Sequence, residues 1–124
     1  MKLKNDGFSL MFSALIAACG SNSTAYNAPP SPPSLTADVA ATPSITFTPN
    51  KVVILVGGTV TFDFGAVPHN VYFDAEVPGS PANVPGNNAS VKKPVTFNAI
   101  GTFVYNCHIH PGMQGTVVVQ TPAH

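Results

Sequence analysis

The chain has 124 residues, five of them basic and five acidic, so its formal net charge is zero and only 8% of its residues are charged. This length supports one small domain, and the near absence of charge excludes the basic face that binding to nucleic acid requires. Thirteen prolines, ten glycines and no tryptophan, with valine and phenylalanine in short runs, predict a turn-rich, all-β protein.

The first residues have the pattern of an export signal. Two lysines precede an apolar run over residues 8–18, and a helix of that length would rise about 16 Å, roughly half a bilayer core, so we expect a signal peptide over residues 1–18. The run ends in Leu-Ile-Ala-Ala-Cys at residues 15–19, which resembles the lipobox of bacterial lipoproteins. We therefore expect an exported chain, anchored by a lipid on Cys19 at the periplasmic or cell-surface side of a bacterial membrane. An ordinary signal peptide with an incidental cysteine is the alternative.

The two cysteines are predicted to have separate roles. If Cys19 carries a lipid, Cys107 is the only free thiol in a compartment that oxidises thiols, which makes sense if a metal ion holds it as a thiolate. The alternative is a disulfide between Cys19 and Cys107, although Cys19 lies in a polar tract far from any core pattern.

Residues 19–43 have no apolar periodicity and contain a Pro-Pro-Ser-Pro-Pro cluster, so we expect a disordered tether there. The folded domain is predicted over residues 44–120, followed by a tail over residues 121–124. Residues 74–94 are rich in proline, glycine and asparagine and are expected to be mostly loop.

Short apolar runs with period-two alternation predict the strands of this domain. They lie at residues 45–48, 51–56, 59–64, 70–73, 95–97, 103–105 and 116–120, with a turn at Gly57-Gly58. Short strands at this spacing, with no convincing helix, indicate an all-β, two-sheet sandwich of about seven to eight strands.

The segment that ends the domain offers metal ligands at regular spacing. Cys107, His110 and Met113 follow one another at three-residue intervals between two predicted strands, and His69 precedes another strand. A thiolate, two imidazoles and a weak thioether are the ligands of a blue-copper site. Zinc sites usually present paired cysteines or two histidines in an H-x₃₋₅-H helix turn, and an iron–sulfur cluster of the ferredoxin type would need four cysteines; none of these patterns occurs here. A Cys/His hydrolase is conceivable, but nothing supplies an orienting partner, and Met113 would be idle.

The motif Gly101-Thr-Phe-Val-Tyr-x-Cys107-x-x-His110-Pro-Gly-Met113-x-Gly115, with Pro68-His69-Asn70-Val71 upstream, resembles the short-loop members of the plastocyanin/azurin family of cupredoxins. The resemblance implies a Greek-key β-sandwich that binds one type 1 copper ion. It implies that His69, Cys107 and His110 surround the metal and that Met113 is the weak axial ligand. Asn70 would bond across to the cysteine loop and restrain the thiolate. His108 is expected to lie outside the ligand set, because neighbouring side chains of an extended chain point in opposite directions.

The same resemblance implies an electron carrier and not an enzyme. We expect a monomer that shuttles one electron between redox proteins, such as cytochromes, oxidases or reductases, which dock at an apolar patch around His110. The alternative is a protein that stores or delivers copper without redox turnover.

Overall fold

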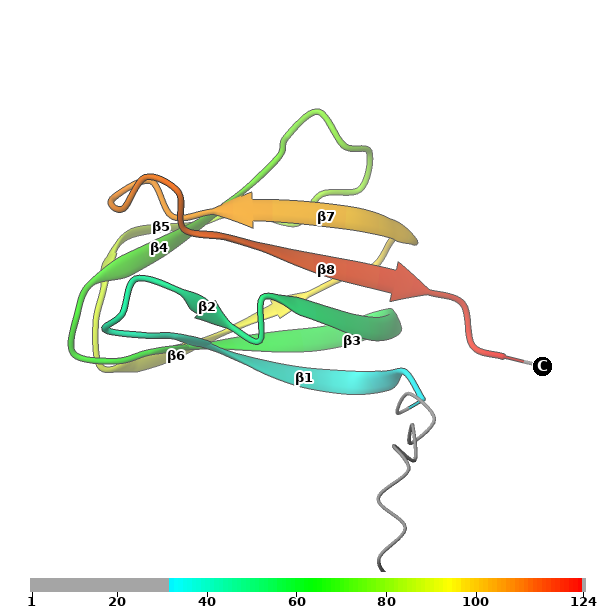
Figure 1. Cartoon of the computed structure of the whole chain (residues 1–124). Helices are drawn as coiled ribbons and strands as arrows, with labels where there is room; N and C mark the ends of the chain where they lie inside the picture. The colour runs from blue at the N-terminus through cyan, green and yellow to red at the C-terminus, as the bar shows by residue number, and fades with distance from the viewer. Residues whose placement is uncertain (1–31, 124) are drawn as a thin grey trace, which may run out of the picture. The chain divides into compact units, whose positions relative to one another are not determined.

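The computed structural model describes residues 32–123, and these contain eight strands and no helix, which confirms the predicted all-β fold (Figure 1). No segment of this part of the chain is a helix long and apolar enough to cross a membrane. The predicted signal peptide, Cys19 and the start of the predicted tether lie outside the described residues. The strands are β1 (Ser34–Ala41), β2 (Phe47–Thr48), β3 (Lys51–Phe64), β4 (His69–Phe73), β5 (Val84–Asn88), β6 (Val91–Thr96), β7 (Gly101–Asn106) and β8 (Gln114–Gln120).

The long strand β3 belongs to both layers of the sandwich. Its first half pairs in parallel with β8, whereas its second half pairs in parallel with β1 and antiparallel with β6. The change of partner occurs at Gly57, whose φ of 86° is readily adopted only by glycine. One layer therefore contains β2, β1, β3 and β6, and the other contains β3, β8, β7, β4 and β5.

Strand β1 corrects the prediction that residues 19–43 form a tether, which is wrong for residues 34–41. Its residues Ala37, Val39 and Ala41 alternate towards the core, where Val39 is fully buried. The signal was weak because two of these three side chains are small, so the strand depends on its ladder of hydrogen bonds with β3. The folded domain accordingly begins at residue 34 and not at residue 44.

The region between β4 and β6 also differs from the prediction. Residues 74–94 were expected to be mostly loop, yet they include β5 and the start of β6. Both strands contain proline, which lacks the N–H group that a central strand needs, and both lie beside only one partner strand. Lys92 and Lys93 next to Pro94 are typical of an edge strand that is protected from pairing with other chains.

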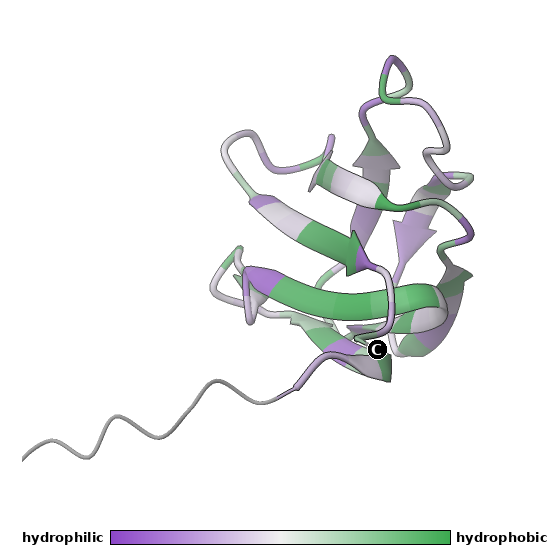
Figure 2. Ribbon diagram, turned by 90° about the vertical axis from the view of Figure 1, so that its right-hand side faces the viewer, coloured by the Kyte–Doolittle hydropathy of each residue, from purple (hydrophilic) through white to green (hydrophobic). Residues whose placement is uncertain are grey.

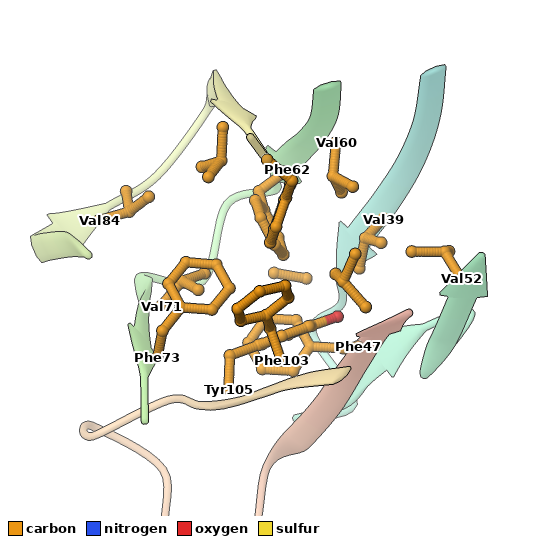
Figure 3. Packing of buried hydrophobic residues seen from close by; sticks show 14 of the residues in the cluster. Val39, Phe47, Val52, Val60, Phe62, Val71, Phe73, Val84, Phe103 and Tyr105 are labelled. Atoms are coloured by element: carbon orange, nitrogen blue, oxygen red, sulfur yellow. The ribbon is translucent and has the colours of Figure 1, made fainter. Parts of the chain in front are cut away.

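The core lies between the two layers and is rich in aromatic side chains (Figure 3). Tyr105 is fully buried, with its ring centroid 4.8 Å from that of Phe47 and 5.1 Å from that of Phe62, both in edge-to-face geometry. Hydrophobic residues form long stretches of the strands that enclose the core (Figure 2), and in β3 and β8 burial alternates from residue to residue over most of the strand. This packing provides a rigid base for the loops at the ends of the strands.

Three of these loops lie at the same end of the sandwich, the left-hand end in Figure 1. They are residues 42–46 between β1 and β2, residues 65–68 between β3 and β4, and residues 107–113 between β7 and β8. Segments that are far apart in the sequence therefore meet at one edge of the core.

Candidate metal centre

His69 is the first residue of β4 and is completely buried. Its Nε2 lies 3.0 Å from the backbone carbonyl of Thr42. Because a carbonyl can only accept, Nε2 must carry the proton, and the neutral ring then presents an unprotonated Nδ1. Burial lowers the pKa of His69, and the positive charge that His110 can carry lowers it further. Both effects favour the neutral imidazole that a metal ion requires.

Cys107 and His110 come from the β7–β8 loop, which is closed by its own backbone. The N–H of Cys107 donates to the carbonyl of Met113 at 3.0 Å, and the N–H of Met113 donates to the carbonyl of His110 at 3.1 Å. Gly112 turns the chain with a φ of 90°. The loop therefore holds Cys107 buried and His110 partly buried on the side that faces His69.

The three donor atoms converge. His69 Nδ1 lies 3.1 Å from His110 Nδ1, and Cys107 Sγ lies 4.0 Å from the first nitrogen and 3.7 Å from the second. A metal ion bound at about 2.0 Å to nitrogen and about 2.3 Å to sulfur would separate these donors by about 3.3 to 3.8 Å. The observed spacings bracket that range, so the residues present fit a single ion.

Asn70 joins the two ligand loops. Its backbone N–H points at Cys107 Sγ, 3.5 Å away, and its side-chain Oδ1 accepts from the N–H of His108 at 2.7 Å. Hydrogen bonds of this kind stabilise a thiolate and fix its direction. The sequence resemblance implied that Asn70 bonds across to the cysteine loop, and its effect on the thiolate stays a prediction.

Met113 and His108 differ in their relation to the cluster. Met113 is buried immediately before β8, and its backbone bonds to both Cys107 and His110. The ring of His108 is exposed and stacks on Tyr72 at a centroid distance of 3.9 Å. Among residues 32–123, only His69, Cys107 and His110 form a metal-capable group of histidine, cysteine and acidic side chains.

Two contacts that orient His69 were missed by sequence reasoning. Thr42 falls within the range predicted to be tether, and it acts through a backbone carbonyl, which has no sequence signature. Asn88 donates from its side chain to the carbonyl of His69 at 3.1 Å, and it lies in the region expected to be loop. Only the pairing of β5 with β4 places Asn88 opposite His69.

A β-sandwich with a largely buried His–Cys–His cluster and a neighbouring buried methionine defines a class of protein that binds one metal ion with soft ligands, for which copper is the best match. Residues 34–120 match the family model described as copper binding proteins, plastocyanin/azurin family. The chain belongs to this family, and its site fits one type 1 copper ion.

Individual relatives agree with this assignment. The chain is 42% identical over 69 residues to an amicyanin from Paracoccus denitrificans, a match that covers 54% of this chain and 53% of the relative. The chain thus spans about half the length of that curated relative. A solved structure of a mutant amicyanin in its oxidised state is 33% identical, with a TM-score of 0.59, and the match covers 67% of this chain and 80% of that one.

A copper-containing nitrite reductase from Thermus scotoductus is also similar, at 26% identity and a TM-score of 0.60. The match covers 77% of this chain but only 24% of the reductase. The resemblance is therefore to one part of a much longer chain.

Proposed function

We propose that this protein is an exported blue-copper electron carrier that shuttles one electron between redox partners. The observation that supports the proposal is the convergence of two imidazole nitrogens and one cysteine sulfur within 4.8 Å of one another, at the end of a rigid sandwich. Copper held by such ligands supplies a one-electron couple. The chain's own residues hold the ligands in place, so few nuclei need to move when the electron passes.

Burial of the ligands favours a carrier over a copper-delivery protein. His69 and Cys107 are 0% and 3% exposed, and both are restrained by hydrogen bonds from neighbouring loops. A protein that hands its metal to another must expose ligands for exchange, whereas among His69, Cys107 and His110 only His110 is partly exposed.

The test is the visible spectrum of the full chain after addition of Cu(II). We expect an intense sulfur-to-copper charge-transfer band that disappears in Cys107→Ser. The matched control is Cys19→Ser, which should keep the band because Cys19 is not one of the proposed ligands. A pale adduct, or a band that survives Cys107→Ser, would contradict the proposal and favour storage or delivery.

The partners that we propose are cytochromes, oxidases or reductases that dock around His110. Pro68, Pro111 and Gly112 are exposed near this ligand, and Ile109 is 38% exposed. None of the loops at residues 42–46, 65–68 and 107–113 carries a lysine, arginine, aspartate or glutamate. Docking should therefore be brief, largely apolar and only weakly dependent on salt.

The location that we propose is the outer side of a bacterial membrane, with a lipid on Cys19. The apolar run at residues 8–18 and the sequence Leu-Ile-Ala-Ala-Cys support this proposal. Mass spectrometry of the mature N-terminus tests it. A diacylglycerol-modified Cys19 is expected, and an unmodified N-terminus at another residue would refute the anchor.

A further inference from the structure

Two strongly exposed aliphatic side chains lie at the end of the sandwich opposite the metal centre. Of the large hydrophobic side chains in the described part, Leu35 and Ile100 are the most exposed, at 55% and 57%. Leu35 is the second residue of β1, and Ile100 immediately precedes β7, so both belong to the right-hand end of the domain in Figure 1. Exposed aliphatic residues are ordinary when they are scattered singly, but these two share one end of the fold.

Backbone contacts confirm that the segments of Leu35 and Ile100 meet. A Cβ on Gly58 would lie 2.9 Å from the carbonyl oxygen of Leu35. The N–H of Gly57 donates to the carbonyl of Phe97 at 2.7 Å, and the N–H of Phe97 donates to the carbonyl of Gly58 at 2.9 Å. We call the surface that these segments form the distal end. It comprises residues 32–36, 55–59, 97–101 and 119–123.

The segments of the distal end carry no charge. None of their residues is a lysine, arginine, aspartate or glutamate. The acidic residues Asp74 and Glu76 lie in the loop after β4, which reaches the distal end where Gly79 packs against Ala99. A basic cluster that would attract anionic lipid is therefore missing from these segments, and any contact that they make must be apolar.

The polypeptide enters the domain at the distal end. The described part begins at residue 32, and β1 runs from there to Thr42, whose carbonyl contacts His69. The eight residues of β1 span about 25 Å. Residues 19–33 would span at most about 50 Å if fully extended. A lipid on Cys19 would therefore keep the distal end within reach of the bilayer, at a high effective concentration.

We propose that the distal end contacts the lipid bilayer, with Leu35 and Ile100 in the interface and the metal centre facing away from the membrane. The inference depends on the lipid anchor proposed above and adds an orientation to it. Because the anchor holds the domain near the bilayer, the small apolar surface of two side chains is sufficient for contact. His110 then lies about 25 Å above the lipid surface, which selects redox partners that reach it from the aqueous side.

The test is nuclear magnetic resonance of the mature, lipidated chain in phosphatidylcholine nanodiscs, with the methyl groups of isoleucine and leucine labelled. The protein is copper-free, because Cu(II) would itself broaden the signals. A nitroxide on the lipid headgroup should strongly attenuate the methyl signals of Leu35 and Ile100. The signals of Ile45 and Ile109, which lie in the loops at the metal end, should stay nearly unchanged, and they serve as controls within the same molecule.

Substitutions test whether the contact is apolar. Leu35→Ser should weaken the contact by about fivefold, seen as lost attenuation at Ile100, because the exposed half of the leucine side chain no longer leaves water. Leu35→Met keeps the apolar surface and should retain the attenuation. The matched control is Val91→Ser, which removes a side chain that is 40% exposed and lies opposite Phe64, at the metal end of β6. Anionic phosphatidylglycerol in the nanodisc should not strengthen the contact.

The outcomes separate the membrane contact from the anchor and from the copper site. In a lipidated protein, equal attenuation at Ile45, Ile109 and Ile100, or none at all, would overturn the membrane contact and leave the anchor standing. Signals of Leu35 and Ile100 that shift with protein concentration in lipid-free Cys19→Ser would also overturn it, because the distal end would then bind a second copy. A mature chain with unmodified Cys19 would overturn the anchor and the contact together. A chain that forms no blue site would overturn the electron carrier alone, since this test needs no copper.

Discussion

Removing the hydroxyl group of Tyr105 should stabilise the protein. This side chain is fully buried, and its oxygen has no hydrogen-bond partner among the described residues. A buried hydroxyl without a partner costs about 1 to 3 kcal/mol relative to its hydrated state in the unfolded chain. Tyr105→Phe removes that cost and keeps the edge-to-face contacts of the ring with Phe47 and Phe62.

The expected gain is about 1 to 2 kcal/mol, because the loss of one oxygen atom also leaves a small void. For a domain of this size, each kcal/mol raises Tm by about 4 to 8 °C. The assay is urea or thermal unfolding of the copper-free full chain, followed by circular dichroism. Because burial raises the pKa of Tyr105, the phenol stays neutral, and the gain should be equal at about pH 6 and about pH 8.

Tyr72→Phe is the matched control, since Tyr72 is only partly buried, and we expect a change within about 0.5 kcal/mol. If Tyr105→Phe instead lowered the free energy of unfolding by more than about 1 kcal/mol, the hydroxyl would have a partner in solution. The reasoning would then be refuted.

Three further predictions concern the site and its supports. Gly115→Ala should destabilise the fold by about 3 kcal/mol or more, because a Cβ at this position would overlap the buried ring of Tyr105. The measurement is urea unfolding, and an unchanged midpoint urea concentration would contradict the close packing of Gly115 against Tyr105. Asn70→Ala leaves the N–H of His108 without its acceptor and should weaken copper retention by about tenfold or more in chelator competition, whereas equal retention would show that Asn70 does not support the loop. The third prediction concerns pH. Since burial lowers the pKa of His69 below 6.5, the unfolded chain binds more protons between the folded pKa and 6.5. The copper-free protein should therefore keep this contribution to stability above 6.5 and lose it as pH falls through that window. His69→Gln should reduce the slope of the free energy of unfolding against pH in this window. An unchanged slope would show that His69 is not the group that titrates there.

The sequence alone was sufficient for the local half of the metal site. Cys107, His110 and Met113 lie on one short loop, so their spacing is visible in the chain and a hairpin between two strands is enough to bring them near one another. The second half of β3 was also predictable, because in residues 59–64 the order of apolar and polar residues follows the period-two burial. The predicted turn at Gly57-Gly58 was wrong, because residues 51–64 form the single strand β3, whose two halves pair with different strands. Strands β1, with its small side chains, and β5, with proline and glycine, were not predicted.

Only the tertiary structure decided the contacts of the metal site between residues that are distant in the sequence. His69 meets Cys107 across 38 residues because β4 pairs with β7, and the carbonyl of Thr42 orients His69 because β1 ends beside them. A backbone carbonyl is the same in every residue, and a positive φ at Ile45 contradicts the local preference of isoleucine. Such features arise from the pairing of whole strands, which fixes the position of each turn whatever residue occupies it.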